Sequence, residues 1–343
     1  MFDAWKERQR QRLKNRPERT VFYNIFATMM LVLVVELLMA VASILAVNVT
    51  GQLDENAKDL LTMRVRNRAS YVQEILRNAE DLEQLSEQIT ATTQQLLKSG
   101  DISLDTLDNS SEQSDALLVA LAPQLLDTLR TKQVTGIFIM LNTHDLDTCE
   151  VGKKMPGIYL RDQDPDARPS ERNSDLLLER ASATVVKELA IGTDKGWQPA
   201  FPYQANTKGG ILRTVFQAAY KSGASLSAEN YGHWTTNSYC LAGDDRNAIA
   251  YSLPLILPDG TVYGVVGVEL LTDYLQTKLP FTELDEDKAG TYFIVTTTDD
   301  ALTDDVLSLR KTVTSGEDLV TADAPLGVLN CRSNGNGGNW AEL

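Results

Sequence analysis

Residues 249–271, IAYSLPLILPDGTVYGVVGVELL, contain two apolar runs on either side of a Pro-Asp-Gly sequence at 258–260. The runs are rich in β-branched and aromatic residues, and Pro-Asp-Gly is typical of a turn, so the stretch predicts an antiparallel β-hairpin. Gly264 and Gly267 interrupt the second run, where they allow another backbone to approach closely. The apolarity of both strands predicts that the hairpin lies in the core of a folded domain.

Two helices and a strand are predicted before this hairpin. Residues 61–89 place apolar side chains at steps of three, four or seven, which predicts an amphipathic helix, and residues 115–132 predict a second helix. Residues 134–141, VTGIFIML, predict a short buried strand. Helices followed by strands indicate an α+β domain. The remaining expectations are a polar break at 98–115, a long polar excursion between strands at 142–175, a helix at 175–190, a strand or a helix at 211–220, and a strand at 291–298.

The N-terminal part of the chain predicts a membrane anchor. Residues 21–47 form an apolar run that is longer than the roughly 20 residues a helix needs to cross a membrane. The tail before it is rich in Lys and Arg, which is typical of a cytoplasmic flank, so we expect the rest of the chain outside the cytoplasm. The alternative is a cleaved signal peptide, because Ala-Val-Ala at 40–42 matches a small-residue cleavage site. Glu36 lies inside the run, either bonded to another helix or as a carboxyl group tolerated near lipid.

Charge and cysteine content exclude some classes of function. The formal net charge is −15 although the tail is basic, which argues against a nucleic-acid partner for the remaining chain. This acidity either maintains solubility or favours cationic ligands. Cys149, Cys240 and Cys331 are widely spaced and form no CxxC pair, so a zinc or redox motif is absent. One disulfide with a spare thiol and three isolated buried cysteines are both open.

Motifs for catalysis or metal binding are missing from the sequence. The chain has only His144 and His233, and it contains no GxSxG, HExxH or GxxxxGK[ST] pattern. The acidic run at 162–166 starts like a calcium loop, but Ala167 and Asn173 stand where the loop needs Gly and Glu. We therefore predict no catalytic residue, no cofactor and no EF-hand; an irregular cation site stays open.

Aromatic residues among polar ones are the candidates for ligand binding. They occur in the segments 196–203, 216–220 and 231–239 and at Tyr251. Trp and Tyr combine an apolar body with a polar tip, which suits a pocket for small amphipathic ligands. Arg161 could hold a ligand carboxylate through two parallel hydrogen bonds. The alternative is that the aromatic residues belong to the core and that Arg161 pairs with a neighbouring Asp.

Several short motifs resemble those of one family. In chain order they are YLRDQDP, SDLLLERA, GWQP, YGHWT, YSLPL and DGTVYGVVGVELLTDYL. Together they resemble the double-Cache (PAS-like) extracytoplasmic sensor regions of bacterial membrane signalling proteins, above all the sensor half of GGDEF-type diguanylate cyclases. The resemblance covers about residues 50–300, and the final strand hairpin is its most specific part.

The resemblance implies a pocket and a set of domains. The pocket positions are Arg161, Trp197, Trp234 and Tyr251, with Asp245 as a weaker candidate. Members that bind amines or amino acids place an Asp shortly after a Tyr in this region, whereas Cys240 and Leu241 follow Tyr239 here. The implied parts are a cytoplasmic tail (1–20), a transmembrane helix (21–47), a long membrane-emerging helix (48–98), a membrane-distal Cache sensor domain (99–282) and a partial membrane-proximal Cache-like domain (283–343).

Three hypotheses follow for the function. The first is an extracytoplasmic sensor of a small molecule, a homodimer at the cell membrane, whose output domain, a diguanylate cyclase or a histidine kinase, is not part of these residues. The second is a membrane-anchored adhesion or assembly module that dimerises through a helix at 55–96 and binds no ligand. The third is an external hydrolase, which requires a carboxylate pair such as Asp244 and Glu269 in one cleft.

Overall fold

The structure is a computed structural model of the chain. It describes residues 6–7, 17–109, 111–167, 173–203, 211–235, 238–279, 290–295, 306–307, 318–324 and 327–333, and for residues 17–20, 46–50, 54, 58, 61 and those from 290 onward it describes the backbone alone. The chain divides into two compact units, Met1–Arg64 and Val65–Leu343.

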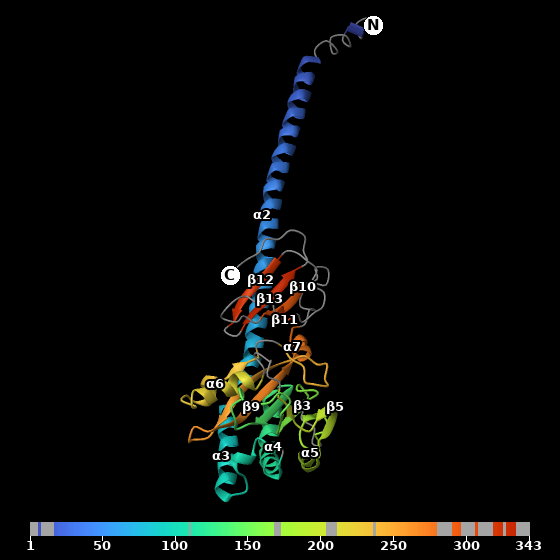
Figure 1. Cartoon of the computed structure of the whole chain (residues 1–343). Helices are drawn as coiled ribbons and strands as arrows, with labels where there is room; N and C mark the ends of the chain where they lie inside the picture. The colour runs from blue at the N-terminus through green and yellow to red at the C-terminus, as the bar shows by residue number, and fades with distance from the viewer. Residues whose placement is uncertain are drawn as a thin grey trace. The chain divides into compact units, whose positions relative to one another are not determined.

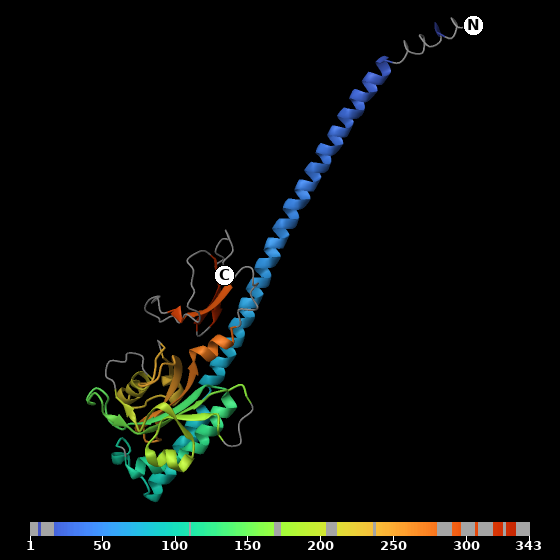
Figure 2. The ribbon, with the colours of Figure 1, turned by 90° about the vertical axis from the view of Figure 1, so that its right-hand side faces the viewer.

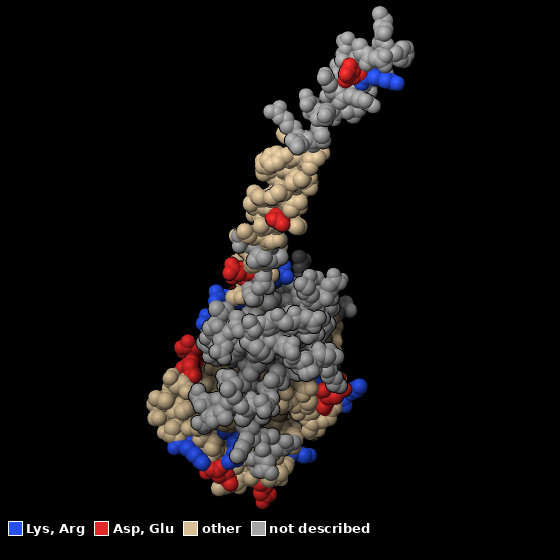
Figure 3. Space-filling view, turned by 90° about the horizontal axis from the view of Figure 1, so that it is seen from above, with Lys and Arg blue, Asp and Glu red and all other residues tan. Residues whose placement is uncertain are grey.

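The first unit is dominated by helix α2 (Pro17–Glu80), which continues into the second unit (Figure 1). Its segment Val21–Leu45 is the one described helix that is long and apolar enough to cross a membrane. The side chains of this segment are exposed, and Figure 3 shows a stretch of largely uncharged surface. Glu36 is the one charged residue in the sequence of this segment. The predicted N-terminal apolar helix is thus confirmed.

Two further helices follow α2 in the second unit. They are α3 (Glu83–Ser99) and α4 (Glu112–Lys132), which pack against each other. The polar break between them contains the short helix η1 (Leu104–Thr106). Ser111 caps α4 by accepting a hydrogen bond from the N–H of Ser114, which satisfies one of the free donors of the first turn.

The long helix expected at 48–98 is interrupted at Asp81 and Leu82. Leu82 leaves helical geometry, with φ −111° and ψ 7°, and its side chain is buried. Asp81 forms an ion pair of 2.8 Å with Lys132 at the end of α4. Burial of an apolar side chain and a bond to a neighbouring helix therefore hold the chain where it turns from α2 into α3.

A seven-stranded sheet forms the centre of the second unit, in the order β5-β4-β3-β1-β9-β8-β7. Neighbouring strands are antiparallel except β4 and β5, which are parallel. Figure 2 shows α6 on one side of the sheet and the pair α3 and α4 on the other. The bounds are β1 Gly136–Leu141, β3 Gly157–Asp162, β4 Leu176–Arg180, β5 Gly192–Gln198, β7 His233–Trp234, β8 Ala248–Ile256, β9 Val262–Leu271 and α6 Arg213–Lys221.

The predicted hairpin is present as β8 and β9, and β9 also pairs with the buried strand β1. Gly260 in the turn has a φ of +86°, a conformation that glycine adopts without strain. A Cβ atom at Gly264 would lie 2.4 Å from the carbonyl oxygen of Met140 on β1. Glycine is therefore required here for the close approach of β9 to β1. With the long helix and the sheet in place, the predicted α+β fold class is confirmed.

Two expectations about the middle of the chain are wrong. The segment 142–175, expected as a polar excursion, contains β2 (Lys154–Met155) and the fully buried central strand β3. The segment 175–190, expected as one helix, is β4 followed by the short helix α5 (Ala183–Leu189). In both cases strands buried on two faces lack the alternation of polar and apolar residues that marks a half-buried strand. The open choice at 211–220 is resolved as helix α6.

The remaining elements are short or lie near the C-terminus. A second sheet has the order β11-β10-β13-β12, and β10 confirms the strand expected from residue 291. Cys331 lies on β13, and its side chain is outside the described residues. The bounds are β6 Phe201–Pro202, η2 Ala228–Tyr231, α7 Thr272–Thr277, β10 Gly290–Val295, β11 Val306–Leu307, β12 Asp318–Ala324 and β13 Gly327–Ser333.

Candidate functional site

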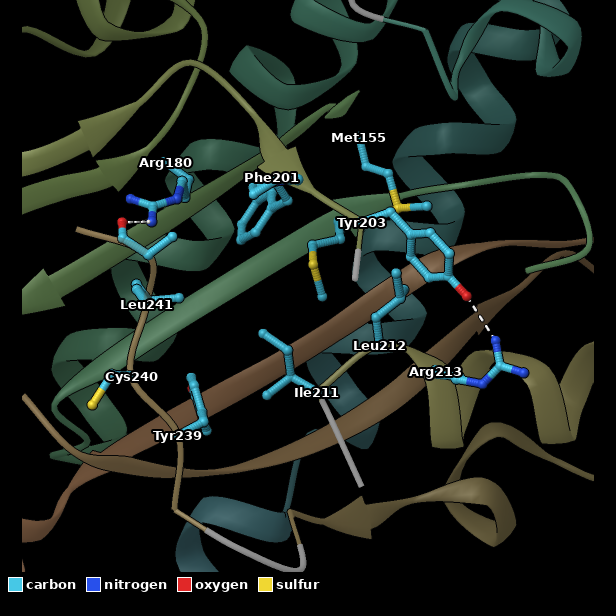
Figure 4. A pocket seen from close by; sticks show the side chains of 13 residues that line it. Met155, Arg180, Phe201, Tyr203, Ile211, Leu212, Arg213, Tyr239, Cys240 and Leu241 are labelled. Carbon is cyan, nitrogen blue, oxygen red and sulfur yellow. Dashed lines mark hydrogen bonds between the residues drawn. The ribbon is translucent and has the colours of Figure 1, made fainter. Parts of the chain in front are cut away.

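A cavity of about 140 Å³ lies on the face of the main sheet that α6 covers (Figure 4). Most of its wall is apolar and comes from the main sheet, from the paired strands β2 and β6, from the start of α6 and from the segment 239–242. The polar side chains in the wall are two arginines and two tyrosines. The lining residues are Met140, Met155, Arg180, Phe201, Pro202, Tyr203, Ile211, Leu212, Arg213, Tyr239, Cys240, Leu241 and Ala242.

Arg213 and Tyr203 form one polar side of the cavity. Arg213 donates a hydrogen bond of 2.6 Å to the Tyr203 hydroxyl, drawn as a dashed line in Figure 4. The Tyr203 hydroxyl donates its own proton to the carbonyl oxygen of Leu146 at 2.9 Å. The guanidinium of Arg213 also forms an ion pair with Asp147. Its charge is therefore matched by a carboxylate outside the cavity wall.

Arg180 is a buried cation of a different kind. It ends β4, is 1% exposed, and donates to the carbonyl oxygens of Glu179 (2.6 Å), Gly196 (2.9 Å) and Ala242 (2.6 Å). In the described part of the chain its bonding partners are all backbone carbonyls, and no carboxylate lies within ion-pair distance. Burial lowers the pKa of Arg180, because the charged form has lost water. Burying a cation without a carboxylate partner lowers the stability of the folded state, and the guanidinium of Arg180 is buried in this way at the wall of a cavity.

Arg161 lies on the same face of the sheet, but each of its three guanidinium nitrogens already bonds to a carboxylate. Its Nε and Nη2 atoms each bond to one oxygen of Glu269 at 2.7 Å, and its Nη1 bonds to Glu179 at 3.2 Å and to Asp244. Gly136 on β1 stands between Arg161 and Glu269 in the sheet register, and the missing side chain lets the two meet across the strand. Arg161 thus pairs with carboxylates from distant elements and does not line the cavity.

The ion pairs of Arg161 extend to the surface through Arg246. Arg246 bonds to Asp244 at 2.8 Å, to Glu179 at 2.7 Å and to Asp194. Burial acts to raise the pKa of Asp244, but hydrogen bonds from Arg246 and Arg161 outweigh burial and lower the pKa to about 2. Burial raises the pKa of Glu179, whose Oε2 atom is buried without a hydrogen-bond partner in the described residues.

Two tyrosines connect these ion pairs to the cavity. The Tyr159 hydroxyl on β3 bonds to Glu269, and it also bonds to the hydroxyl of Tyr239 at 2.6 Å. Tyr239 lines the cavity, whereas Tyr159 is fully buried beneath it. Hydrogen bonds from Tyr239 through Tyr159 to Glu269 therefore connect the cavity wall to the ion pairs of Arg161.

The other residues expected in a pocket lie elsewhere. Trp234 and Tyr251 come together on β7 and β8, with ring centroids 5.5 Å apart, and the Trp234 Nε1 donates to Glu80 at the end of α2 at 2.6 Å. Trp197 on β5 donates to the carbonyl oxygen of Ala181 at 3.1 Å. Asp245 is exposed in the loop before β8. The structure thus joins two of the five predicted residues, and it joins them at an edge of the sheet.

Metal binding and hydrolysis find no support in the described residues. They contain no group of three or more His, Cys, Asp or Glu side chains that could hold a metal ion. Asp244 and Glu269, the carboxylate pair that a hydrolase would need, are near each other but buried and bonded to Arg161. His144 contacts Asp108 at 2.8 Å.

Of the three cysteines, the structure describes the side chains of two, and neither is fully buried. Cys149 is half-buried and Cys240 is exposed, and neither forms a disulfide among the described residues.

Sequence reasoning missed Arg180 and Tyr239 as cavity residues. Arg180 falls in the segment expected as a helix, where a charged residue is usually solvated. The signal that could have found it is the apolar run at 176–178 directly before Glu179 and Arg180, which suits a buried strand with charges at its end. Tyr239 was noted among the aromatic segments, but the partner of its hydroxyl, Tyr159, comes from β3, far away in the sequence.

Comparisons with known proteins found similar solved structures. No model of a protein family and no curated protein matches the chain. The periplasmic sensory domain of the Campylobacter jejuni chemoreceptor Tlp1 matches with a TM-score of 0.41 and 13% identity, over 69% of this chain and 68% of that one. The ligand-binding domain of the Pseudomonas aeruginosa PAO1 amino-acid chemoreceptor PctC, in complex with GABA, matches with a TM-score of 0.36 and 15% identity, over 80% and 96%.

A third similar structure is the extracellular domain of a protein described as a histidine kinase, with a TM-score of 0.32 and 15% identity. The match covers 67% of this chain and spans 63% of the length of that one. All three similar chains are sensory, ligand-binding or extracellular domains, as their descriptions state. At these identities and TM-scores the function of this chain has to be argued from its own residues.

Proposed function

We propose that this chain is the ligand-sensing extracytoplasmic part of a membrane receptor and that its cavity binds a small carboxylate. The observation that carries the proposal is Arg180, a buried guanidinium that lines the cavity and has only backbone carbonyls as partners in the described residues. A ligand carboxylate would supply the direct ion pair that the described residues do not form with Arg180.

The rest of the wall fits a carboxylate with a short apolar body. The described lining contains two arginines and no Asp or Glu, so an anion meets no repulsion from the wall itself. Met140, Met155 and Leu212 offer apolar surface, and methionine adapts to ligands of different shape. The negative net charge of the chain thus does not extend to this lining.

The cavity wall is also connected to the helix that leads toward the predicted membrane span. The backbone N–H groups of Tyr239 and Thr235 both donate to β8 at 2.9 Å. Tyr239 in the cavity wall and Trp234 on β7 therefore lie along the same edge of β8. The Trp234 Nε1 bonds to Glu80 at the end of α2, the helix that contains Val21–Leu45. Movement of the wall on ligand binding would change this contact, and α2 would carry the change.

Our proposal for the whole receptor includes features that the resemblance implies. Residues 99–282 would form the membrane-distal sensor and residues 283–343 part of a proximal domain, with an output domain such as a diguanylate cyclase across the membrane.

A homodimer is supported by exposed apolar side chains on α2. Leu53, Leu60 and Met63 are 61%, 56% and 58% exposed and follow each other at steps of seven and three, as in a helix–helix seam. This seam would serve an assembly module equally, so ligand binding decides between the two functions.

The test is a thermal-shift screen of the full chain in lipid nanodiscs. A ligand of the folded state raises the unfolding temperature by mass action. We expect acetate, butyrate and 3-hydroxybutyrate to include stabilising ligands, and ethylamine and glucose to have no effect. Arg180→Gln should abolish the response, while Lys187→Gln, which removes an exposed charge on α5, should keep it. An unchanged response of Arg180→Gln would show that the cavity is not the site.

A further inference from the structure

Behind the cavity, Tyr239, Tyr159 and Glu269 are joined by hydrogen bonds, and Glu269 fixes which group donates and which accepts in each bond. This carboxylate is fully buried and receives two hydrogen bonds of 2.7 Å from Arg161. An ionised carboxylate can only accept hydrogen bonds, so the Tyr159 hydroxyl must donate its proton to Glu269. The opposite orientation would make the lone pairs of the phenol and of the carboxylate face each other at short range.

The bond between Tyr159 and Glu269 also fixes the donor and the acceptor in the next bond, which reaches Tyr239 in the cavity wall. A phenol has one proton, and that of Tyr159 is used by Glu269. In the 2.6 Å bond between the two tyrosines, Tyr239 must therefore be the donor and Tyr159 the acceptor. Burial raises the pKa of both phenols well above its usual value, so both keep their protons at neutral pH.

Resting on the proposed function, we infer that Tyr239 determines ligand specificity, because its oxygen can accept a hydrogen bond from a ligand but cannot donate one. A ligand group placed against Tyr239 has to be a hydroxyl or an N–H. An ether oxygen at the same place would face a phenol oxygen with no proton left to give. An alkyl group would leave the lone pairs of the phenol oxygen without a hydrogen-bond donor.

The other polar side chains of the wall make Tyr239 distinct. The guanidinium groups of Arg180 and Arg213 can only donate, and the hydroxyl of Tyr203 already donates to Leu146 and accepts from Arg213. The described wall thus has a donating part, suited to a carboxylate, and an accepting part at Tyr239. The preferred ligand class is a small carboxylate that carries a hydroxyl or amino group.

The experiment compares three probes of similar size on the full chain in nanodiscs: 3-hydroxybutyrate, its methyl ether 3-methoxybutyrate, and butyrate. Isothermal titration should show 3-hydroxybutyrate binding about tenfold more tightly than the ether, since one lost hydrogen bond is worth about 1.4 kcal/mol. In Tyr159→Phe, the Tyr239 hydroxyl no longer has the Tyr159 oxygen as its acceptor and can donate into the cavity. The preference for 3-hydroxybutyrate over its methyl ether should therefore shrink. In Tyr239→Phe the preference should vanish.

Each outcome decides between the two claims. Equal binding of 3-hydroxybutyrate and 3-methoxybutyrate to the unmodified chain would overturn the role of Tyr239 and leave the carboxylate cavity standing. Binding of none of the three probes would overturn the proposed carboxylate function, and with it this inference. Because the pair of probes is decisive on the unmodified chain, a tyrosine variant that fails to fold does not prevent the test.

Discussion

Replacing Arg161 with Met should destabilise the protein by about 3–5 kcal/mol, because it leaves buried carboxylates without their shared cation. Glu269 and Glu179 have fully buried side chains, and that of Asp244 is 4% exposed. Arg246 still neutralises part of the charge of Glu179 and Asp244, but Arg161 is the one ion-pair partner of Glu269 in the described residues. A loss of this size is a large part of the 5–15 kcal/mol that stabilises a typical domain.

The assay is urea unfolding of the full chain in detergent micelles at pH 7, followed by intrinsic fluorescence. The matched control is the double variant Arg161→Met with Glu269→Met, which removes the pair together and should recover at least half of the loss. A loss of less than about 1 kcal/mol in the single variant would refute the reasoning, because it would mean that burying Glu269 without Arg161 costs little.

Three more predictions follow from the same contacts. Asp244 has its pKa lowered to about 2 from 3.8, so its stabilisation, about 2 kcal/mol, is present above pH 3.8 and is lost as the pH falls toward 2. Urea unfolding at pH 5 and at pH 2.5 should show this loss, and Asp244→Asn should reduce it. Gly136→Ala places a Cβ atom 2.8 Å from the buried carboxylate of β9 and should cost about 1–3 kcal/mol, whereas Gly192→Ala, with 3.8 Å to its nearest neighbour, should cost less than 1. Trp234→Phe removes the hydrogen bond to Glu80, while carboxylates should still bind. Hydrogen exchange of the amides around Glu80 should then no longer respond to the ligand; a response equal to that of the unmodified chain would exclude this contact as the link to α2.

The sequence predicted those elements whose pattern is local. The hairpin at 249–271 combines strand-forming residues with turn chemistry, and helix α4 combines an apolar stripe with a capping residue. The break at Asp81 and Leu82 could not be seen in this way. It depends on the ion pair with Lys132, about fifty residues away, and on burial of one leucine in a core that the local pattern does not contain.

Strands β3 and β4 were missed for a related reason. Both are buried on two faces, and both carry charged residues at their ends, which made their segments look polar or helical. Charged residues are rare in a buried strand unless other elements neutralise them. The elements that neutralise Arg161 are β9, the loop before β8 and β4, whose carboxylates lie 108, 83 and 18 residues away in the sequence.

The choice between Arg161 and Arg180 shows what decides whether an arginine can bind a ligand. Arg161 is the second-last residue of β3, Arg180 is the last residue of β4, and each is 1% exposed, so neither sequence pattern nor burial separates them. What separates them is the bonding partners of each guanidinium. The glycine at 136 leaves room for Glu269 to reach Arg161, whereas Arg180 bonds only to carbonyl oxygens in the described residues. A carbonyl holds the guanidinium in place without cancelling its charge. In the proposed function, backbone carbonyls position the guanidinium of Arg180 at the cavity, while Arg161 pairs with Glu269, the acceptor that would set the direction of the hydrogen bonds reaching Tyr239.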